Sequence, residues 1–371
     1  MSSQLNIALL GAGGFANFAA KAFLKIPGVR IVAVTDVHEP AAAQLAREVQ
    51  ADVVPDYPAL LADARVQVVY IATPPWLHYS QSKQALEAGK HVICEKPAAL
   101  HADEAEELAA LARSRNLLYV VNLMQRYNPL YAFVQTIIRE RWLGDFVHGF
   151  FENYASDEQL TPDHWFWNAE KSGGIFIEHG VHFFDMFEGW LGAGKLVSAF
   201  DIQRAGMEQP IIDRVQATVL YPRGPVNFYH GFNQPKVLDR QEMRLQFDRG
   251  DITLYEWVPV KFRLHGLLIT EHFEKLQAAF PNGTLLTHSA GLPSPQSVRG
   301  KFQDIHYDVE VTFEAGDAAD KMDRYQQLVM SMLQDQWRWI LDPAHRRMID
   351  ENNAVASLRL AEQATVQALH F

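Results

Sequence analysis

The stretch Gly11-Ala12-Gly13-Gly14-Phe15-Ala16 decides the fold of the first third of this 371-residue chain. It follows the apolar run of residues 5–10 and opens a helical pattern over residues 15–24. A second apolar run, residues 30–35, then ends at Asp36. A strand, a glycine-rich turn, a helix, a second strand and an acid in this order are typical of a dinucleotide-binding βαβ unit.

Each residue type in this unit has a physical reason. Gly11 permits the tight turn, Gly13 lets the backbone approach a pyrophosphate, and Ala16 is small enough for helix and strand to pack closely. The helix N-terminus offers unpaired N–H groups to phosphates. Asp36 can accept hydrogen bonds from a ribose 2′-hydroxyl and repels a 2′-phosphate, so we expect NAD rather than NADP. An ordinary turn acid at the strand end is the alternative interpretation of Asp36.

Composition narrows the classes of function. The formal net charge is −11, from 33 basic and 44 acidic residues, which argues against sequence-independent nucleic-acid binding and against a polybasic membrane patch. The single cysteine, Cys94, excludes an intrachain disulfide. We see no basic n-region of a signal peptide and no run of about 18 apolar residues, so we expect a cytoplasmic protein without nucleic-acid or membrane partners.

Residues 1–122 alternate between strand and helix patterns. Further continuous apolar runs are typical of parallel strands buried on both faces, and they lie at 66–72, 91–94 and 117–121. Helical patterns separate them at 40–49, 78–88 and 103–115. This order predicts an α/β fold, with an N-terminal NAD-binding Rossmann domain built on a doubly wound parallel sheet.

Residues 123–371 change to alternating segments separated by turn residues. Strands are expected at 146–155, 215–221, 226–232, 242–247, 251–256 and 260–264, and helices at 174–191, 320–341 and 354–369. The pattern predicts a C-terminal α+β domain for substrate binding and oligomerisation, with a large, mostly antiparallel open sheet. The last helix, 354–369, is an element that can pack back on the first domain.

Two parts of this second domain need separate expectations. Residues 265–303 are irregular apart from an amphipathic piece at 271–279. The expected strands at 215–221 and 226–232 carry apolar residues on both alternations. Because large apolar patches rarely stay exposed, we expect a homodimer or homotetramer formed through the uncovered sheet face.

Two polar clusters follow predicted parallel strands. Thr73-Pro74-Pro75-Trp76-Leu77-His78 and Cys94-Glu95-Lys96-Pro97 lie at carboxyl ends, outside which open α/β sheets bind ligands. A fixed ammonium of Lys96 at this place can polarise a carbonyl or stabilise a developing alkoxide. A loop without ligand contact and a solvated lysine are the alternative interpretations.

A third cluster extends from Ser172 to Asp185. Glu178 and His182 are four residues apart and share a face of an α-helix, with Asp185 on an adjacent part of it. A carboxylate one turn away orients a histidine ring and supports its imidazolium, so His182 is the expected general base. A solvated ion pair is the alternative. His179 adds a possible metal ligand, but the spacing compels no third or fourth ligand and we expect no metal.

With these motifs the chain resembles the Gfo/Idh/MocA oxidoreductases, the family of glucose-fructose oxidoreductase and inositol dehydrogenase, over nearly its whole length. The most specific stretch is Ala85-Leu86-Glu87-Ala88-Gly89-Lys90-His91-Val92-Ile93-Cys94-Glu95-Lys96-Pro97. Residues 122–129 are similar to the family's interdomain segment and residues 173–185 to its catalytic helix. The chain departs from the family at Glu178, where many members carry aspartate.

The resemblance implies a dehydrogenase that acts with NAD(P) on CH–OH groups of a sugar, polyol or related compound. It implies Lys96 beside the nicotinamide and the reacting oxygen, His182 as proton acceptor and Glu178 as its partner. Residues implied for the cofactor are Gly11, Gly13, Gly14, Phe15, Ala16, Asp36, Thr73, Pro74, Pro75, His78, Glu95, Lys96 and Asn122. Residues expected at the substrate are Arg126, Trp165, Trp167 and Asp185.

Alternatives remain open at this point. The tryptophans stack on a sugar ring or simply pack under a loop. The same scaffold also serves NAD-retaining glycosidases, which release a free sugar without net NADH formation. A non-catalytic nucleotide-binding regulator is the other alternative, although it would be expected to have lost Lys96 or His182, and both are present.

Overall fold

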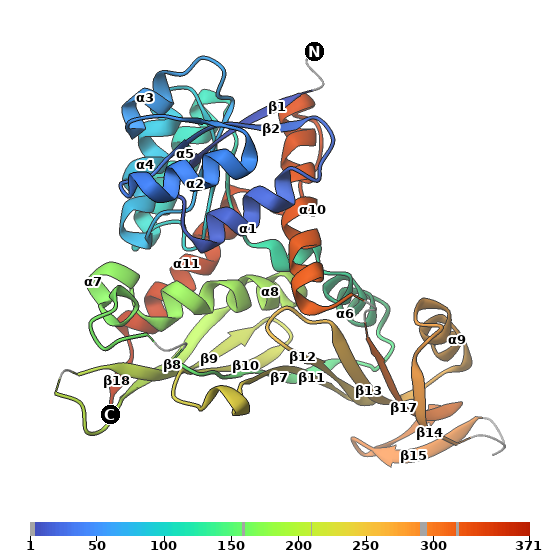
Figure 1. Ribbon diagram of the computed structural model, residues 1–371. Helices are drawn as coiled ribbons and strands as arrows, with labels where there is room; N and C mark the ends of the chain where they lie inside the picture. Colours follow the sequence, from blue (N-terminus) through green and yellow to red (C-terminus); the bar gives the residue numbers. More distant parts are fainter. Residues whose placement is uncertain (1–3, 158–159, 209, 290–294, 317–318) are drawn as a thin grey trace.

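The computed structural model describes residues 4–157, 160–208, 210–289, 295–316 and 319–371. Figure 1 shows a parallel sheet with its helices at one end of the molecule and a broad second sheet at the other. Helices α8 and α6 lie on the face of the broad sheet that is turned toward the first part of the chain. A site between the two sheets can therefore draw side chains from both.

The first sheet is parallel throughout and has the strand order β3-β2-β1-β4-β5-β6. Its strands are β1 (Leu5–Leu10), β2 (Val29–Thr35), β3 (Asp52–Val53), β4 (Val68–Ile71), β5 (His91–Cys94) and β6 (Tyr119–Val121). Its helices are α1 (Gly14–Phe23), α2 (Glu39–Val49), α3 (Tyr57–Ala62), α4 (Pro75–Glu87) and α5 (Ala102–Arg115). The order reverses between β1 and β4, which is where such sheets bind ligands.

The Rossmann sheet confirms the predicted fold class. The apolar runs became strands because their side chains are buried on both faces, as Ile7, Val34 and Val69 are. Strand β3 and helix α3 were not predicted. Strand β3 has two residues and both are exposed, so it leaves no hydrophobic pattern in the sequence.

The second sheet has ten strands in the order β14-β17-β13-β12-β11-β7-β10-β9-β8-β18. Its strands are β7 (Phe146–Tyr154), β8 (Lys195–Gln203), β9 (Ile212–Tyr221), β10 (Gly224–Gly231), β11 (Arg240–Phe247), β12 (Gly250–Tyr255), β13 (Lys261–Leu268), β14 (Thr284–His288), β17 (Val309–Gly316) and β18 (Leu369–His370). Neighbours are antiparallel except β7 with β10 and β8 with β18. The mostly antiparallel sheet is thus confirmed.

The segment predicted to be irregular, 265–303, contains more structure than its pattern indicated. It holds the end of β13, helix α9 (Thr270–Ala279), strand β14 and β15 (Gln296–Gly300), which pairs with β16 (Gln303–Tyr307) as a separate hairpin. Residues 290–294 of this segment lie outside the described residues. The hairpin strands are largely exposed, so they have no apolar alternation to detect.

The remaining helices of the described chain all follow β6 in sequence. They are α6 (Pro129–Glu140), α7 (Ala169–Ser172), α8 (Val181–Leu191), α10 (Lys321–Leu341) and α11 (Glu351–Val366), with short turns η1 (Met124–Tyr127), η2 (Trp165–Trp167), η3 (Phe176–Gly180) and η4 (Lys236–Leu238). In Figure 1, α10 lies alongside α1, and the ring of Tyr325 on α10 is 4.7 Å from that of Phe18. The division of the chain at residue 122 stays a prediction.

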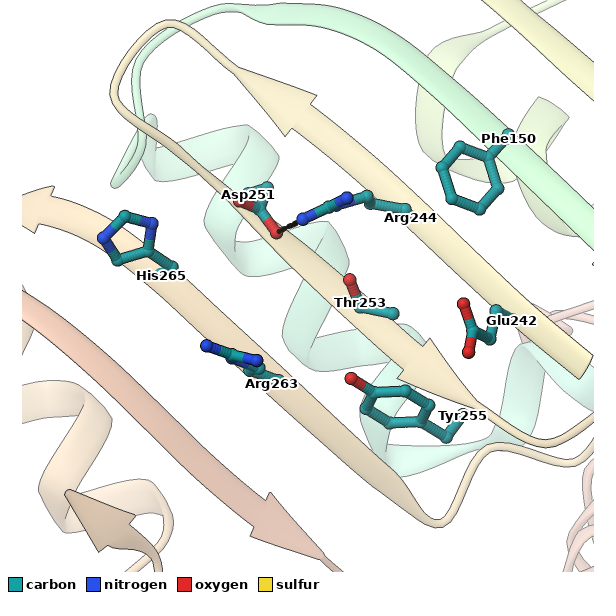
Figure 2. A pocket seen from close by; sticks show the side chains of 8 residues that line it. All are labelled: Phe150, Glu242, Arg244, Asp251, Thr253, Tyr255, Arg263 and His265. Atoms are coloured by element: carbon teal, nitrogen blue, oxygen red, sulfur yellow. Dashed lines mark hydrogen bonds and ion pairs between the residues drawn. The ribbon is translucent and has the colours of Figure 1, made fainter. Parts of the chain in front are cut away.

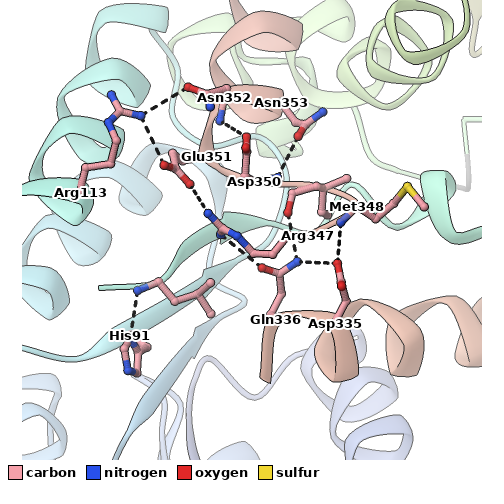
Figure 3. A network of polar contacts seen from close by, with 12 residues as sticks. His91, Arg113, Asp335, Gln336, Arg347, Met348, Asp350, Glu351, Asn352 and Asn353 are labelled. Atoms are coloured by element: carbon pink, nitrogen blue, oxygen red, sulfur yellow. Dashed lines mark hydrogen bonds and ion pairs between the residues drawn. The ribbon is translucent and has the colours of Figure 1, made fainter. Parts of the chain in front are cut away.

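A polar network holds the connection between α10 and α11 (Figure 3). Arg347 donates to Glu351 at 2.7 Å, and Arg113 of α5 reaches the same carboxylate at 3.4 Å. Asp335 accepts from the backbone of Met348 at 2.8 Å. These contacts tie α11 to a helix of the first sheet and to α10 at once.

The expectation of apolar residues on both faces of β9 and β10 is met only in part, because the face away from α8 carries Leu220 and Tyr229 among polar residues. Val226 and Phe228 are fully buried on the face that α8 covers, where Phe228 packs 4.8 Å from Phe184. The opposite face carries polar and charged side chains along β11 to β13, including the ion pair between Arg244 and Asp251 at 3.0 Å (Figure 2). Assembly through that face remains a prediction.

Candidate functional site

The glycine-rich turn leaves room above the start of α1. Gly11 has φ of +101°, and a Cβ on it would lie 2.7 Å from the carbonyl oxygen of Ala72, so only glycine fits. A Cβ on Gly13 or Gly14 would meet no atom within 4 Å. The N–H groups of the first helical turn are therefore approachable, as phosphate binding requires. Beside this turn Ala16 is fully buried, and Phe15 lies 5.8 Å from the ring of Tyr325 on α10.

Asp36 stands directly beside this turn. Its carboxylate accepts hydrogen bonds from the N–H of Ala12 and the N–H of His38, both at 2.7 Å. Asp36 therefore anchors the turn, as expected of a turn acid at a strand end. Each oxygen retains a second lone pair, so the partly exposed carboxylate is also able to accept from ribose hydroxyls.

The loop after β4 is held in place by the buried side chain of His78. His78 of α4 is buried, and its two ring nitrogens lie 2.6 Å from the carbonyl of Pro97 and 2.7 Å from that of Thr73. Burial lowers the pKa of His78. Pro74 and Pro75 form the N-cap and first position of α4. His78 thus ties the loops after β4 and β5 together, and its burial leaves little surface for a cofactor.

Glu95 and Asn122 form a buried polar cluster with Tyr70. The hydroxyl of Tyr70 and the amide of Asn122, at 2.9 Å, both donate to the same Glu95 oxygen. Burial raises the pKa of Glu95 to about 7. The oxygen of the Asn122 amide is buried without a partner in the described chain. Contact of this pair with a cofactor stays a prediction.

Lys96 carries the central contact of the site, because it joins the two parts of the chain. From the carboxyl end of β5 its ammonium donates to the carbonyl of Glu178 at 2.7 Å and forms an ion pair with the Glu178 carboxylate. Both side chains are largely buried, with 21% and 13% of their surface exposed. The two residues are 82 positions apart in sequence.

His182 is buried at the start of α8, close enough to Lys96 for its charge to act on the ring. Burial first and then the charge of Lys96 lower the pKa of His182 to about 3. Its Nδ1 atom is buried without a partner among the described residues. The expected carboxylate does not orient this ring, since Glu178 pairs with Lys96 and Asp185 with another residue.

Asp185 and Arg126 form a buried pair away from these groups. Arg126 of η1 donates to both carboxylate oxygens of Asp185, at 2.7 and 2.9 Å, and to its backbone carbonyl at 2.9 Å. Asn353 of α11 adds a hydrogen bond at 3.2 Å. This pair is a brace between η1, α8 and α11. The contacts do not support the predicted role of Arg126 and Asp185 at the substrate.

The expected tryptophans lie on η2 and are partly exposed. The ring of Trp165 packs edge-on against Trp76 of α4 at 5.7 Å, so it bridges the two parts of the chain. The guanidinium of Arg204 lies 5.5 Å from the ring of Trp167. Both rings are engaged in packing and are partly exposed, and their stacking on a sugar ring stays a prediction.

A histidine pair that the sequence pattern did not predict lies beside His182. His179 lies on η3, which is π-helical rather than α-helical, and its Nδ1 is 2.9 Å from Nδ1 of His230 on β10. Burial and the charges of His230, Lys96 and His182 lower the pKa of His179. His230 is 51 residues away, and no sequence signal indicates the pairing.

Two features are absent from the described residues. They contain no group of three or more His, Cys, Asp or Glu side chains arranged to hold a metal ion. Within the same ranges, no helix has both the length and the hydrophobicity needed to cross a bilayer.

Comparison with known proteins identifies the family of the chain. The family model described as "Oxidoreductase family, NAD-binding Rossmann fold" matches residues 5–123, and the "GFO/IDH/MocA C-terminal domain" model matches residues 131–253. A curated relative, the NAD-dependent scyllo-inositol 2-dehydrogenase of Bacillus subtilis, is 29% identical over 52% of this chain and 56% of its own length. A dTDP-3,4-didehydro-2,6-dideoxy-α-D-glucose 3-reductase of Actinomadura kijaniata is 34% identical over 34% of this chain and 37% of its own. The matches span 34% to 60% of the relatives' lengths.

Solved structures share the fold over nearly the whole chain. KijD10, a 3-ketoreductase from Actinomadura kijaniata solved with NADP and TDP-benzene, superposes with a TM-score of 0.75 at 17% identity, covering 99% of both chains. GenD2 from gentamicin A biosynthesis, solved with NAD, has a TM-score of 0.74 at 18% identity, covering 98% of this chain and 94% of its own. Because both family models match along one chain, this protein belongs to the Gfo/Idh/MocA oxidoreductase family and has its NAD(P)-binding Rossmann fold.

Proposed function

We propose that this oxidoreductase uses NAD to interconvert a hydroxyl and a carbonyl on a sugar, polyol or related small molecule. The ion pair between Lys96 and Glu178 carries the proposal, because it brings an ammonium from the dinucleotide-binding part to the helix that bears His182. The names of the sugar and inositol enzymes among its relatives support the substrate class.

The residues of the turn fit a dinucleotide. Gly13 and Gly14 leave open space above the N–H groups of α1, and Asp36 has lone pairs free for ribose hydroxyls. Lys96 follows β5, which lies next to β4 and two strands from β1 in the same parallel sheet. The cofactor would supply hydride transfer at its nicotinamide ring, and the protein would position the substrate and handle the proton.

Lys96, Glu178 and His182 would stabilise charge and move the proton. Lys96 donates hydrogen bonds to the reacting oxygen and stabilises negative charge that develops on it during oxidation. Glu178 holds the ammonium in place through the ion pair and through its own carbonyl. His182 is neutral near pH 7 and its Nδ1 has no partner among the described residues, so it is the proposed acceptor of the hydroxyl proton. In the oxidation, the hydride of the substrate C–H bond would pass to the oxidised dinucleotide and the hydroxyl proton to His182, which leaves the carbonyl.

A substrate screen tests the proposal. Purified protein is supplied with NAD and with sugars, polyols and their acids, and NADH is followed by its absorbance. NADH formation that depends on Lys96 and His182 supports it. Release of free sugar without net NADH would favour the NAD-retaining glycosidase, and dinucleotide binding without turnover would favour the regulator. The matched control is His148→Asn, because His148 lies on β7 and bonds Asn227 instead of a site residue.

Assembly and location are part of the same proposal. We infer a homodimer or homotetramer in the cytoplasm, acting on a small molecule and not on nucleic acid. The polar open face shown in Figure 2 is the candidate interface, and its charged pairs would make association sensitive to salt. Light scattering that shows a monomer at micromolar concentration would contradict the assembly.

A further inference from the structure

Two histidines next to the proposed site share one hydrogen bond. Nδ1 of His179 lies 2.9 Å from Nδ1 of His230, with the two rings nearly perpendicular at 85°. A hydrogen bond between two imidazole nitrogens needs one protonated and one bare nitrogen. One ring therefore donates and the other accepts. This choice decides whether Nε2 of each neutral ring carries a hydrogen.

The surroundings of His230 decide which ring donates. Its ring is fully buried and packs against Phe151 at 5.1 Å, Phe183 at 5.8 Å and Phe176 at 6.0 Å. Its Nε2 has no partner among the described residues, and a Cβ built on Gly180 would lie only 3.7 Å from it. Because buried N–H groups are very rarely left unpaired, Nε2 is the bare nitrogen and the proton is on Nδ1. His230 is then the donor of the pair.

His179 must consequently be protonated on its other nitrogen. Its Nδ1 accepts from His230, and burial keeps the ring neutral, so Nε2 carries the hydrogen. Nε2 makes no hydrogen bond in the described part of the chain and is not among its buried unpartnered atoms. The side chain is partly exposed, which leaves an N–H donor available to a ligand.

We propose that His179 Nε2–H donates to a substrate oxygen other than the reacting one, and that His230 is the positioning residue that fixes this tautomer. The proposal rests on the proposed function, since it names a further contact of that substrate. The rings of Phe183 and Phe232 each lie 5.2 Å from the His179 ring. A hydroxyl or carbonyl oxygen beside an apolar C–H surface, as on a polyol or sugar ring, has the complementary chemistry.

The tautomer can be read without any substrate. Full-length protein labelled with ¹⁵N-histidine is examined by long-range ¹H–¹⁵N correlation at pH 7.5, with signals assigned through His179→Gln and His230→Gln. We expect His230 protonated on Nδ1 and His179 on Nε2. The His230→Gln variant should change the His179 signal, whereas His148→Gln on the opposite sheet face should not. A proton on Nδ1 of His179 would overturn the proposal.

Kinetics then test the contact with a substrate found in the screen. His179→Phe should raise KM about 10- to 100-fold with kcat changed far less, because a ground-state hydrogen bond is lost. His179→Gln, whose amide also reaches as a donor, should recover part of this loss. Wild-type enzyme should reject a deoxy analogue that lacks the bonded oxygen, and His179→Phe should not.

The outcomes separate the two proposals. An active enzyme whose KM and analogue preference are unchanged by His179→Phe refutes the role of His179 and leaves the proposed function standing. A fall in kcat alone refutes it as well, because the residue would then act on the reaction step. Wild-type protein that neither binds dinucleotide nor forms NADH refutes the proposed function instead, while the tautomer is still decided by NMR.

Discussion

Removing the titratable ring of His230 should change how stability depends on pH. Burial lowers the pKa of His230 to about 3, compared with about 6.5 in an unfolded chain. Between about pH 6.5 and pH 3, the unfolded state therefore binds a proton at His230 and the native state does not. Such a group costs the protein nothing above pH 6.5, and it destabilises the native state progressively as pH falls from about 6.5 toward 3.

The size of the effect follows from the distance to the unfolded pKa. At pH 5 the difference is about 1.5 units, which is about 2 kcal/mol at 1.36 kcal/mol per unit. His230→Gln lacks this proton uptake. Relative to wild type it should gain about 2 kcal/mol between pH 7.5 and pH 5, whatever its stability at pH 7.5. Glu95 acts with the opposite sign, because its pKa is raised to about 7, but it is present in both proteins and cancels.

The assay is urea unfolding followed by tryptophan fluorescence and circular dichroism at pH 8.5, 7.5, 6.5, 5.5 and 5.0. Between pH 8.5 and 7.5 the two proteins should run parallel, which serves as the internal control. Below pH 6.5 wild type should lose stability faster, with one extra proton bound on unfolding. Profiles that stay parallel down to pH 5 would show that His230 is not held neutral by burial, which would contradict the neutral tautomer assigned to this ring.

Four further outcomes are expected. Asp36→Asn keeps an acceptor for the turn but removes a charge, so preference should shift toward NADP roughly tenfold or more, measured by fluorescence titration; unchanged preference would contradict the cofactor assignment. Lys96→Met should lower kcat about 10²–10⁴-fold with dinucleotide affinity nearly constant, and full turnover would mean that the site is misplaced. Glu178→Asp should lose most activity because the shorter side chain draws the carboxylate away from Lys96; activity near wild type would show that reach is unimportant. Asp185→Asn leaves Arg126 buried without its counter-charge and should cost about 3–5 kcal/mol in urea unfolding, with partial recovery when Arg126→Met is added; a loss below about 1 kcal/mol would argue against the brace.

Local sequence patterns predicted most of the strands and helices of the first domain. Gly11 and the apolar runs on either side are close in sequence, and the constraints that shape the turn act between neighbours. The position of Lys96 also followed from local information, because a residue after a parallel strand must emerge at the carboxyl edge of the sheet. Short or exposed elements such as β3 and the hairpin of β15 and β16 were missed, since they bury too little to leave a pattern.

By itself the sequence determined the Rossmann unit, the change to an antiparallel sheet and the family. Which side chains pair was decided only by the tertiary structure. Helical spacing assigned Glu178 to His182, but Glu178 pairs with Lys96, 82 residues away, and Asp185 pairs with Arg126, 59 residues away. A group that stays charged when buried is stabilised by whatever opposite charge the fold brings beside it, and helical neighbours have no priority in that pairing.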